Sequence, residues 1–373
     1  MKNIAGFLKK DAVLTCAWIL AIVSAFFVRP DLEYLNYPDW ETLGLLFCLM
    51  AVMAGLQAAG LFRRIGEKLL SLVHTTRGLE SVLIFLCFFF SMFITNDVAL
   101  ITFVPFAIGI LHLAKLSERI LPVVVLQTIA ANLGSMFSPI GNPQNLYLYS
   151  KSGTAVFDFF QIMFPYAALS FVGIVVFLLF RKSIPIPPPS SLSEGFLPRR
   201  SLILYLILFC LCLLSVAHIL PVLPLFLLTT ASVALFDRFT LLRVDYSLLL
   251  TFLGFFVFIG NMGRIPEFQH FLAEIITGRE VITSVLASQI ISNVPAALLL
   301  SGFTQDWNSL FIGTNLGGLG TLIASMASLI SYKQIIHHHP ESKGKYLFLF
   351  TIVNLIFLAG LLLEYFILLY VGI

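Results

Sequence analysis

The sequence predicts an all-α polytopic membrane protein made of two repeats of inverted topology, each holding a re-entrant helical hairpin and a broken transmembrane helix. Composition excludes a soluble domain, because 59% of the residues are hydrophobic and only 11% are charged. Apolar runs long enough to span a bilayer recur from end to end of the chain. Three motifs of the first half also return, in the same order, in the second half.

Nine apolar segments fit membrane spans, and two others are interrupted. The nine are residues 12–28, 40–62, 120–150, 160–180, 201–218, 221–236, 246–262, 309–333 and 346–371. Polar residues interrupt the stretch 81–113 at 95–97 and the stretch 281–304 at 292–295. The arms of the second stretch are too short to cross about 30 Å of hydrocarbon. We therefore predict two re-entrant hairpins; the alternatives are one interrupted span, or two full spans, for each stretch.

The basic residues favour hairpins over interrupted spans. With hairpins and a cytoplasmic N-terminus, 18 of the 22 basic residues lie in cytoplasmic loops and four lie outside. Single interrupted spans reduce this split to 13 against nine. We therefore expect a protein of the bacterial-type cytoplasmic (inner) membrane, with its N-terminus in the cytoplasm and its C-terminus outside. No basic stripe indicates a nucleic-acid partner.

The internal repeat is visible as three pairs of motifs. "PDWETLGLLFCLMAVMAG" (38–55) matches "VDYSLLLTFLGFFVFIGN" (244–261), "FITNDVAL" (93–100) matches "IISNVPAA" (290–297), and "ANLGSMFSPIGN" (131–142) matches "TNLGGLGTLIAS" (314–325). The charge pattern makes the first copy enter the membrane from outside and the second from inside, so we predict inverted repeats.

These motifs divide the chain into five parts. They are an N-terminal span and loop (1–38), a first repeat (39–181), a cytoplasmic linker (182–200), two scaffold spans (201–244) and a second repeat (245–373). The first repeat holds a hairpin at 81–113 and a broken helix at 120–150, and the second holds a hairpin at 281–304 and a broken helix at 309–333.

Inverted repeats with interrupted helices are typical of secondary transporters. The backbone groups freed at a break are tolerated in a membrane only where protein lines a cavity. Half-helix N-termini there attract anions, and short polar side chains and carbonyls bind cations. We expect the breaks at 95–97, 134–143, 292–295 and 313–321 to converge on one site. The candidate substrate and ion ligands are Thr95, Asn96, Asp97, Asn132, Gly134, Ser138, Gly141, Asn142, Ser292, Asn293, Thr314, Asn315, Gly317 and Thr321.

Asp97 is the strongest candidate. An ionised carboxylate at the bilayer centre costs roughly 2.5–3.5 kcal/mol, and intramembrane acids mark functional sites. We expect it to bind Na⁺ or H⁺, with Asn96 and Asn293 as further Na⁺ ligands. The structural alternatives are a helix cap for Asp97 and interhelical hydrogen bonds for the asparagines. The glycines equally suit close helix packing.

Other polar residues favour ordinary structural roles. We interpret His337–His339 as a solvated loop, His112 as an interface residue, and Glu364 as a side chain that extends to the outer membrane surface. The chain contains no nucleotide-binding, nucleophile or metalloprotease motif. We therefore expect no enzyme and no cofactor beyond a coupling ion.

The site residues resemble those of the ion-transporter superfamily of arsenite permeases, divalent-anion/sodium symporters, and related citrate and sodium/proton carriers. The resemblance covers the chain from about Asp39 onward and extends to small bacterial anion transporters. Residues 95–97 and 292–294 are similar to the Ser-Asn-Thr hairpin tips of the symporters. "NLGSMFSPIGNPQNLY" is similar to the glycine-rich stretch and turn of their broken helix. Asn96-Asp97 resembles the Asn-Asp of the arsenite permeases.

The resemblance implies a substrate held between hairpin tips and broken helices, coupling to Na⁺ or H⁺, an elevator-type motion and a homodimer. Asp97 and Val294 replace the tip threonines, so neither dicarboxylate specificity nor a full set of Na⁺ ligands follows from the resemblance. We expect an ion-coupled transporter of a small inorganic or organic anion or oxyanion. Arsenite efflux, and Na⁺/H⁺ antiport through Asp97, are the alternatives.

Overall fold

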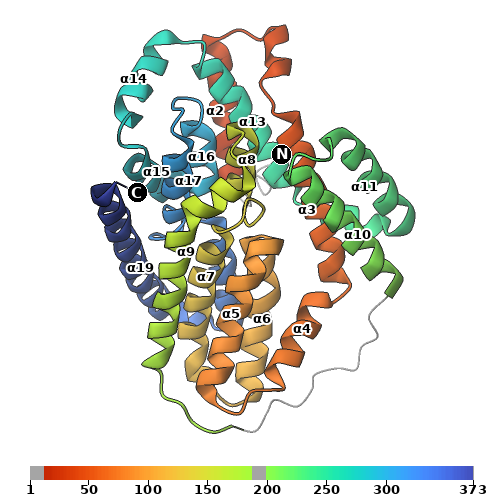
Figure 1. Cartoon of the computed structure of the whole chain (residues 1–373), viewed down its shortest axis with the longest axis vertical. Helices are drawn as coiled ribbons and strands as arrows, with labels where there is room; N and C mark the ends of the chain where they lie inside the picture. Colours follow the sequence, from red (N-terminus) through yellow and green to blue (C-terminus); the bar gives the residue numbers. More distant parts are fainter. Residues whose placement is uncertain (1–11, 187–198, 373) are drawn as a thin grey trace.

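The computed structural model describes residues 12–186 and 199–372, and all its regular elements there are helices (Figure 1). They are α2 (Ala12–Phe27), η1 (Leu32–Asn36), α3 (Trp40–Ala58), α4 (Leu61–Leu70), α5 (Thr76–Ile94), α6 (Asn96–Leu113), η2 (Ser117–Arg119), α7 (Ile120–Ser135), α8 (Pro143–Ser152), α9 (Val156–Leu179), α10 (Arg199–Val216), α11 (Val222–Phe236), α12 (Arg238–Leu241), α13 (Tyr246–Met262), α14 (Pro266–Ile276), α15 (Glu280–Ile291), α16 (Asn293–Leu300), α17 (Trp307–Leu316), α18 (Met326–His338), η3 (Pro340–Ser342) and α19 (Lys343–Val371). The predicted cytoplasmic N-terminus and the middle of the predicted linker 182–200 lie outside the described residues.

The prediction of an all-α polytopic membrane protein is confirmed. In the described ranges six helices are long and apolar enough to cross a membrane: α3, α5, α6, α9, α10 and η3–α19 together. A seventh results if α13 and α14, which meet at a bend of 107°, form one span. Two further predicted spans, α2 and α11, are shorter helices of 16 and 15 residues.

The two predicted hairpins differ in length. Helices α5 and α6 contain 19 and 18 residues, whereas α15 and α16 contain 12 and eight. Helix α5 starts five residues before the predicted boundary because the Thr75 side chain caps it, accepting a hydrogen bond from the Gly78 N–H. Since α5 and α6 are each long enough to cross a bilayer, re-entrance of the first hairpin stays a prediction.

Both hairpins reverse at a single residue with an unusual backbone. Thr95 joins α5 to α6 with φ 67° and ψ 147°, and Ser292 joins α15 to α16 with φ 74° and ψ 154°. Residues other than glycine rarely adopt this region, so surrounding structure must hold it. The same conformation therefore occurs at the same place in both sequence copies.

The two broken helices are interrupted at residues 136–142, between α7 and α8, and at residues 317–325, between α17 and α18. The second interruption begins four residues later than expected. Gly313 lies inside α17, where an added Cβ would be only 2.8 Å from the Val281 backbone of α15. That glycine allows close helix packing rather than a break.

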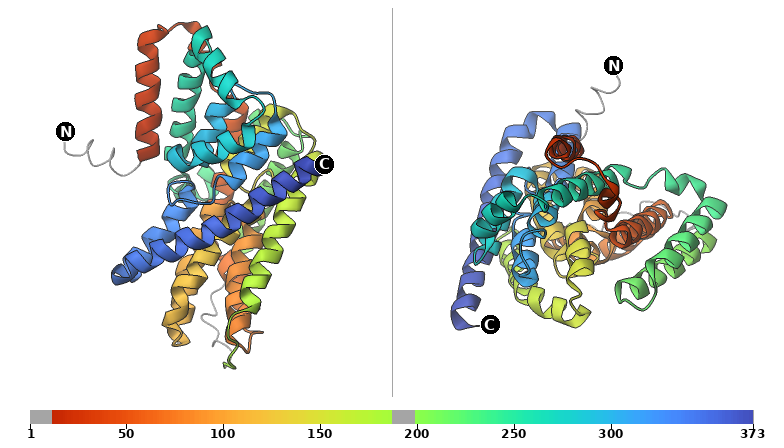
Figure 2. Two further views of the ribbon diagram at one scale, coloured as in Figure 1. Left: turned by 90° about the vertical axis from the view of Figure 1, so that its left-hand side faces the viewer. Right: turned by 90° about the horizontal axis from the view of Figure 1, so that it is seen from above.

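The helices pack in several groups. Helices α5, α6 and α7 pack together with α9 and α18, whereas α3 packs with α10 and α11. Helix α2 packs with α13, and α15, α16 and α17 pack with one another. Figure 1 shows α5–α7 and α9 extending beyond the lower ends of α3, α10 and α11. Helix α19 crosses the first group obliquely (Figure 2).

Ion pairs tie element ends together outside the apolar core. The Glu80 side chain of α5 is 1% exposed and binds Arg119 at 2.7 Å and Arg181 at 3.0 Å, which joins the ends of α5, α7 and α9. At the α13–α14 bend, Arg264 binds Asp31 of the α2–α3 connection at 2.8 Å. Glu364 of α19, expected to extend to the outer membrane surface, is half-buried, and its Oε2 is buried without a hydrogen-bond partner.

Candidate substrate and ion site

The chain breaks meet in one buried polar cluster. At the first tip, the Asn96 N–H donates to the Gly141 carbonyl at 3.0 Å; at the second, the Asn293 N–H donates to the Ala324 carbonyl at 2.9 Å. Each tip asparagine also accepts, through its own Oδ1, the N–H of the residue that follows it, at 3.0 Å. Each hairpin tip is therefore fastened to the break of its own half by the same bonds.

Side-chain amides then join the two halves. The Asn132 Oδ1 accepts hydrogen bonds from Asn96 Nδ2 and from Ser325 Oγ, both at 3.0 Å. The Asn142 Nδ2 donates to Asn315 Oδ1 at 2.9 Å. In the sequence alignment of the repeats, Asn132 corresponds to Asn315 and Asn142 to Ser325. The Asn132–Ser325 bond is thus the counterpart of the Asn315–Asn142 bond.

Two amides that were not among the predicted ligands hold the broken segments in shape. The Asn145 Nδ2 donates to the Met136 and Ser138 carbonyls at 3.2 and 3.1 Å, and its Oδ1 accepts from the Asn315 Nδ2 at 2.6 Å. The Gln289 Nε2 donates to the carbonyls of residues 317 and 319, both at 3.0 Å. Two features of the sequence could have pointed to them. Asn145 lies inside the motif "NLGSMFSPIGNPQNLY", and Gln289 is a lone amide in the apolar arm 281–291.

Asp97 lies in the first turn of α6 and is half-buried. Its backbone N–H bonds the Asn96 side chain, but its carboxylate Oδ1 is buried without a hydrogen-bond partner. A buried carboxylate oxygen without a hydrogen-bond donor is open to a polar solute or to a cation.

Several predicted ligands instead shape the backbone. An added Cβ at Gly134 would overlap the Phe88 carbonyl, and one at Gly141 would overlap the Ser135 carbonyl. An added Cβ at Gly317 would overlap the Ser288 side chain. These glycines therefore allow neighbouring chain segments to approach the broken helices closely. The Ser138 Oγ accepts the Ile140 N–H at 3.3 Å, and the Ser292 Oγ donates to the Ala324 carbonyl at 3.5 Å.

Two threonines stand apart from the cluster, whereas Asn293 and Thr321 lie at its edge. Thr95 makes no capping bond with its side chain, and Thr314 donates to Leu310 inside its own helix at 2.7 Å. The exposed Thr321 donates its N–H to the Gln289 Oε1 at 2.8 Å and its hydroxyl to the Gln289 carbonyl at 3.4 Å. The Asn293 amide lies against Gly318, where an added Cβ would be 2.9 Å from its Nδ2.

The cluster is built from uncharged donors and acceptors. Its hydrogen-bonded members are asparagine amides, serine hydroxyls and backbone groups, and none of the bonds described here involves Lys or Arg. Asp97 is the acidic residue at its edge. The arrangement can exchange hydrogen bonds with a small polar solute and hold one cation at Asp97.

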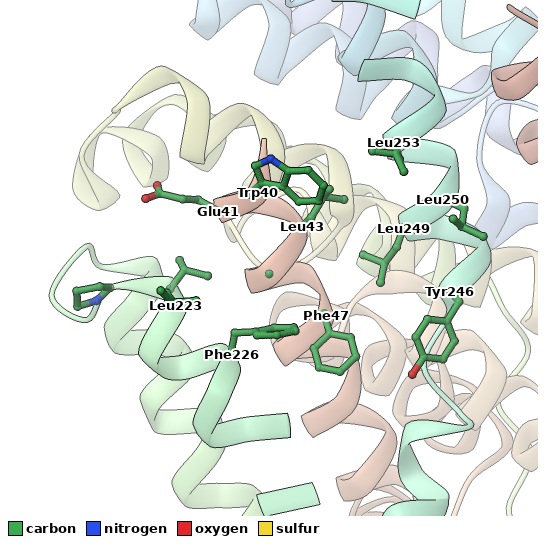
Figure 3. Close-up of a pocket in the computed structure, with 13 residues that line it drawn as sticks. Trp40, Glu41, Leu43, Phe47, Leu223, Phe226, Tyr246, Leu249, Leu250 and Leu253 are labelled. Atoms are coloured by element: carbon green, nitrogen blue, oxygen red, sulfur yellow. The ribbon is translucent and has the colours of Figure 1, made fainter. Parts of the chain in front are cut away.

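A separate apolar cavity lies elsewhere in the molecule. It has a volume of about 720 Å³ and is lined mostly by aliphatic and aromatic residues of α3, α11 and α13 (Figure 3). None of its lining residues belongs to a chain break. In Figure 3, Trp40 and Leu253 lie toward one end of the cavity and Phe47 and Tyr246 toward the other, so α3 and α13 run in opposite directions.

Residues 5–305 match a protein-family model described as a citrate transporter (CitMHS). The chain belongs to this citrate transporter family. Both hairpin tips lie inside the matched region, which ends just before α17. The family places the chain among membrane transporters, in agreement with its apolar helices.

Relatives of this family member carry names that range from general to specific. An uncharacterized transporter of Methanocaldococcus jannaschii is 32% identical over 81% of the chain and 83% of its own length. The inner membrane protein YbiR of Escherichia coli is 29% identical over 79% of the chain and 80% of its own length. The silicon efflux transporter LSI3 of rice (Oryza sativa subsp. japonica) is 34% identical over 38% of the chain and 28% of its own length.

Proposed function

We propose that this citrate-transporter-family protein is an ion-coupled secondary transporter of a small anion or oxyanion, working by elevator-type alternating access. The observation that carries the proposal is the convergence of the breaks on one buried polar cluster, with the unpartnered carboxylate oxygen of Asp97 at its edge. Interrupted helices that meet between two repeats form the substrate and ion sites of many secondary transporters.

Three matched features support inverted repeats. Asp39 and Asp245, aligned in the sequence, cap α3 and α13 through bonds to the N–H three residues on, at 2.9 and 3.0 Å. The hairpin tips share one backbone conformation, and their bonds to the breaks correspond. The opposite directions of α3 and α13 in Figure 3 fit copies that enter the membrane from opposite sides.

The arrangement of the helices supports an elevator motion. The hairpins and broken helices would move as one body along a scaffold that includes α3, α10 and α11. The displacement of α5–α7 and α9 relative to that scaffold in Figure 1 fits one end of such a movement. A bond between the Gln57 Nε2 of α3 and the Thr102 Oγ1 of α6, at 3.0 Å, links the two groups. We expect a homodimer in the inner membrane, with the N-terminus inside and the C-terminus outside.

Asp97 supplies the coupling in this proposal. A bare carboxylate would repel an anionic substrate, so the substrate binds only after Asp97 is protonated or paired with Na⁺. Binding of the ion and binding of the substrate then depend on each other, which is the thermodynamic requirement for coupled transport. Antiport of Na⁺ and H⁺ at Asp97, without an anion, is the alternative for this residue.

The uncharged character of the cluster favours a second candidate substrate class. A citrate trianion needs cationic partners, whereas a neutral hydroxylated acid, such as arsenous or silicic acid, needs groups that both donate and accept hydrogen bonds. The amides and hydroxyls around Asn132 and Asn315 offer that chemistry. The name of the rice relative, a silicon efflux transporter, and the Asn96-Asp97 pair favour the same class.

The test measures thermal stabilisation of the purified protein by Na⁺, pH, citrate, dicarboxylates, sulfate, arsenite and silicate. A ligand at 100 times its dissociation constant stabilises the folded state by about 2.7 kcal/mol. We expect one solute class to raise the melting temperature only with Na⁺ or at low pH, and Asp97→Asn to remove that dependence. Asp158→Asn, an exposed acid in the first turn of α9, is the matched control.

Two results would contradict the proposal. If the wild-type dependence on Na⁺ or pH persists in Asp97→Asn, this carboxylate is not the coupling site. If Na⁺ or pH alone shifts the melting temperature and no solute does, the protein is a cation/proton antiporter instead.

A further inference from the structure

Two histidines from different halves of the chain face each other at one end of the molecule. His112 lies in the last turn of α6 and His339 is the C-cap of α18, and their Nε2 atoms are 3.0 Å apart. The ring centroids are 5.0 Å apart with an interplanar angle of 25°. Because the nitrogens are closer than the centroids, the imidazoles meet edge to edge. From the sequence, His112 is an interface residue and His339 belongs to a separate loop, so this contact comes from the tertiary structure alone.

Each imidazole is oriented by a second partner on its other nitrogen. The His339 Nδ1 is 3.2 Å from the Glu341 Oε1, and the His112 Nδ1 is 3.1 Å from the Ser117 Oγ. An ionised carboxylate only accepts, so the proton of neutral His339 lies on Nδ1 and its Nε2 presents a lone pair to His112. The Ser117 hydroxyl can donate or accept, so it permits either tautomer of His112.

We propose that His112 and His339 form a binding site for one divalent late first-row transition-metal ion, such as Ni²⁺ or Zn²⁺. Imidazole nitrogen is the preferred protein ligand of these ions. Metal–nitrogen bonds of about 2.0–2.1 Å place two ligands of one ion about 3 Å apart, close to the separation here. A carboxylate that accepts the other ring N–H, as Glu341 does, is the usual outer partner of a metal-binding histidine.

The site has two protein ligands and is open to solvent rather than enclosed by protein. In the part of the chain that the structure describes, no three His, Cys, Asp or Glu side chains gather around one point, so water would complete the coordination. His112 is exposed and the His339 side chain is 19% exposed, so an ion can enter from solvent. His338 is turned away, with its Nδ1 3.0 Å from the Gln334 carbonyl of its own helix.

Metal binding would tie α6 to the α18–α19 corner. Without metal, a hydrogen bond from His112 Nε2 to His339 Nε2 holds the two elements together. An ion replaces that bond with two stronger ones, which fasten the first hairpin more firmly to the end of α18 within the body that the proposed function moves. This consequence does not depend on which substrate the protein carries.

The experiment titrates Ni²⁺ and Zn²⁺ into the full-length protein, purified without a polyhistidine tag, and measures the bound metal after dialysis. We expect one ion per chain in the wild type and at least a tenfold loss of affinity in His112→Gln and in His339→Gln. Glu341→Gln should weaken binding about tenfold, because it removes the outer partner. Acidic pH should weaken binding, because a protonated imidazole has no free lone pair.

His337→Gln is the matched control, since this neighbouring histidine is exposed and makes its ring contact with His338. The melting temperature without metal shows whether each variant is folded. Three outcomes would overturn the proposal. The first is unchanged metal binding in both His112→Gln and His339→Gln, and the second is loss of binding in His337→Gln. The third is no bound ion in the folded wild type at saturating metal, which would leave the two histidines joined by a hydrogen bond alone.

Discussion

The Asn132–Ser325 hydrogen bond allows a quantitative test of how the two halves meet. Ser325→Ala removes one bond of 3.0 Å between buried side chains. Such interhelical bonds in membrane proteins average about 0.6 kcal/mol and reach about 1.7 kcal/mol. Asn132→Ala should cost more, about 2 kcal/mol or above, because the donors of Ser325 and Asn96 both lose their acceptor. The double variant should cost less than the sum by about 0.6–1.7 kcal/mol.

The assay is equilibrium unfolding of the four proteins in mixed micelles titrated with a denaturing detergent. Thr251→Val provides the control cycle with Asn132→Ala, because the Thr251 hydroxyl bonds Ser247 of its own helix, α13. That control pair should be additive within about 0.3–0.5 kcal/mol. A coupling energy for Asn132 and Ser325 no larger than the control value would refute the direct bond between the two broken helices.

Three further predictions concern packing and charge. Gly134→Val should destabilise the protein by about 1–3 kcal/mol, since its side chain would meet the α5 backbone, whereas Gly109→Ala, which has open space, should change the melting temperature little. Glu80→Gln should lower the free energy of unfolding by about 3–5 kcal/mol, because it breaks a buried ion triad. Glu67→Gln, which affects the Arg63–Glu67 pair, should lower it by less than about 0.5 kcal/mol. Equal losses of stability in the two variants would contradict this ranking. The hydrogen bond from its arginine partner lowers the pKa of Asp31. The Asp31–Arg264 pair should therefore stabilise the folded protein above the usual aspartate pKa, and this stabilisation should be lost as pH falls through the lowered pKa. Melting curves of the wild type and Asp31→Asn, measured over this pH range, would reveal the dependence.

The places where helices break could be predicted from residue types. Asn96-Asp97 and Ser292-Asn293 stand in apolar runs where unsatisfied polar groups are costly, so they had to mark interruptions. The second broken helix shows the limit of this reasoning. Gly313 was expected to belong to the break, but it packs α17 against α15. Glycine serves close packing and chain reversal alike, and only the neighbouring helix distinguishes the two.

The composition of the cluster was predictable in part. Asn132, Asn142 and Asn315 follow from the aligned motifs, whereas Gln289 contributes through bonds to the carbonyls of residues 317 and 319, about 30 positions along the chain. Thr314 lies in the same motif but bonds within its own helix. A threonine hydroxyl in a helix can always return to its own backbone, so its type alone does not place it in a site.

The sequence by itself determined the membrane class and the places where the apolar helices break, because these depend on hydrophobic length and on the cost of isolated polar groups. The tertiary structure decided which amide bonds which, that Asp97 keeps an unpartnered oxygen, and that His112 meets His339. Such pairings depend on how distant helices are placed in space. Hydrophobic patterning restricts that placement but does not specify it.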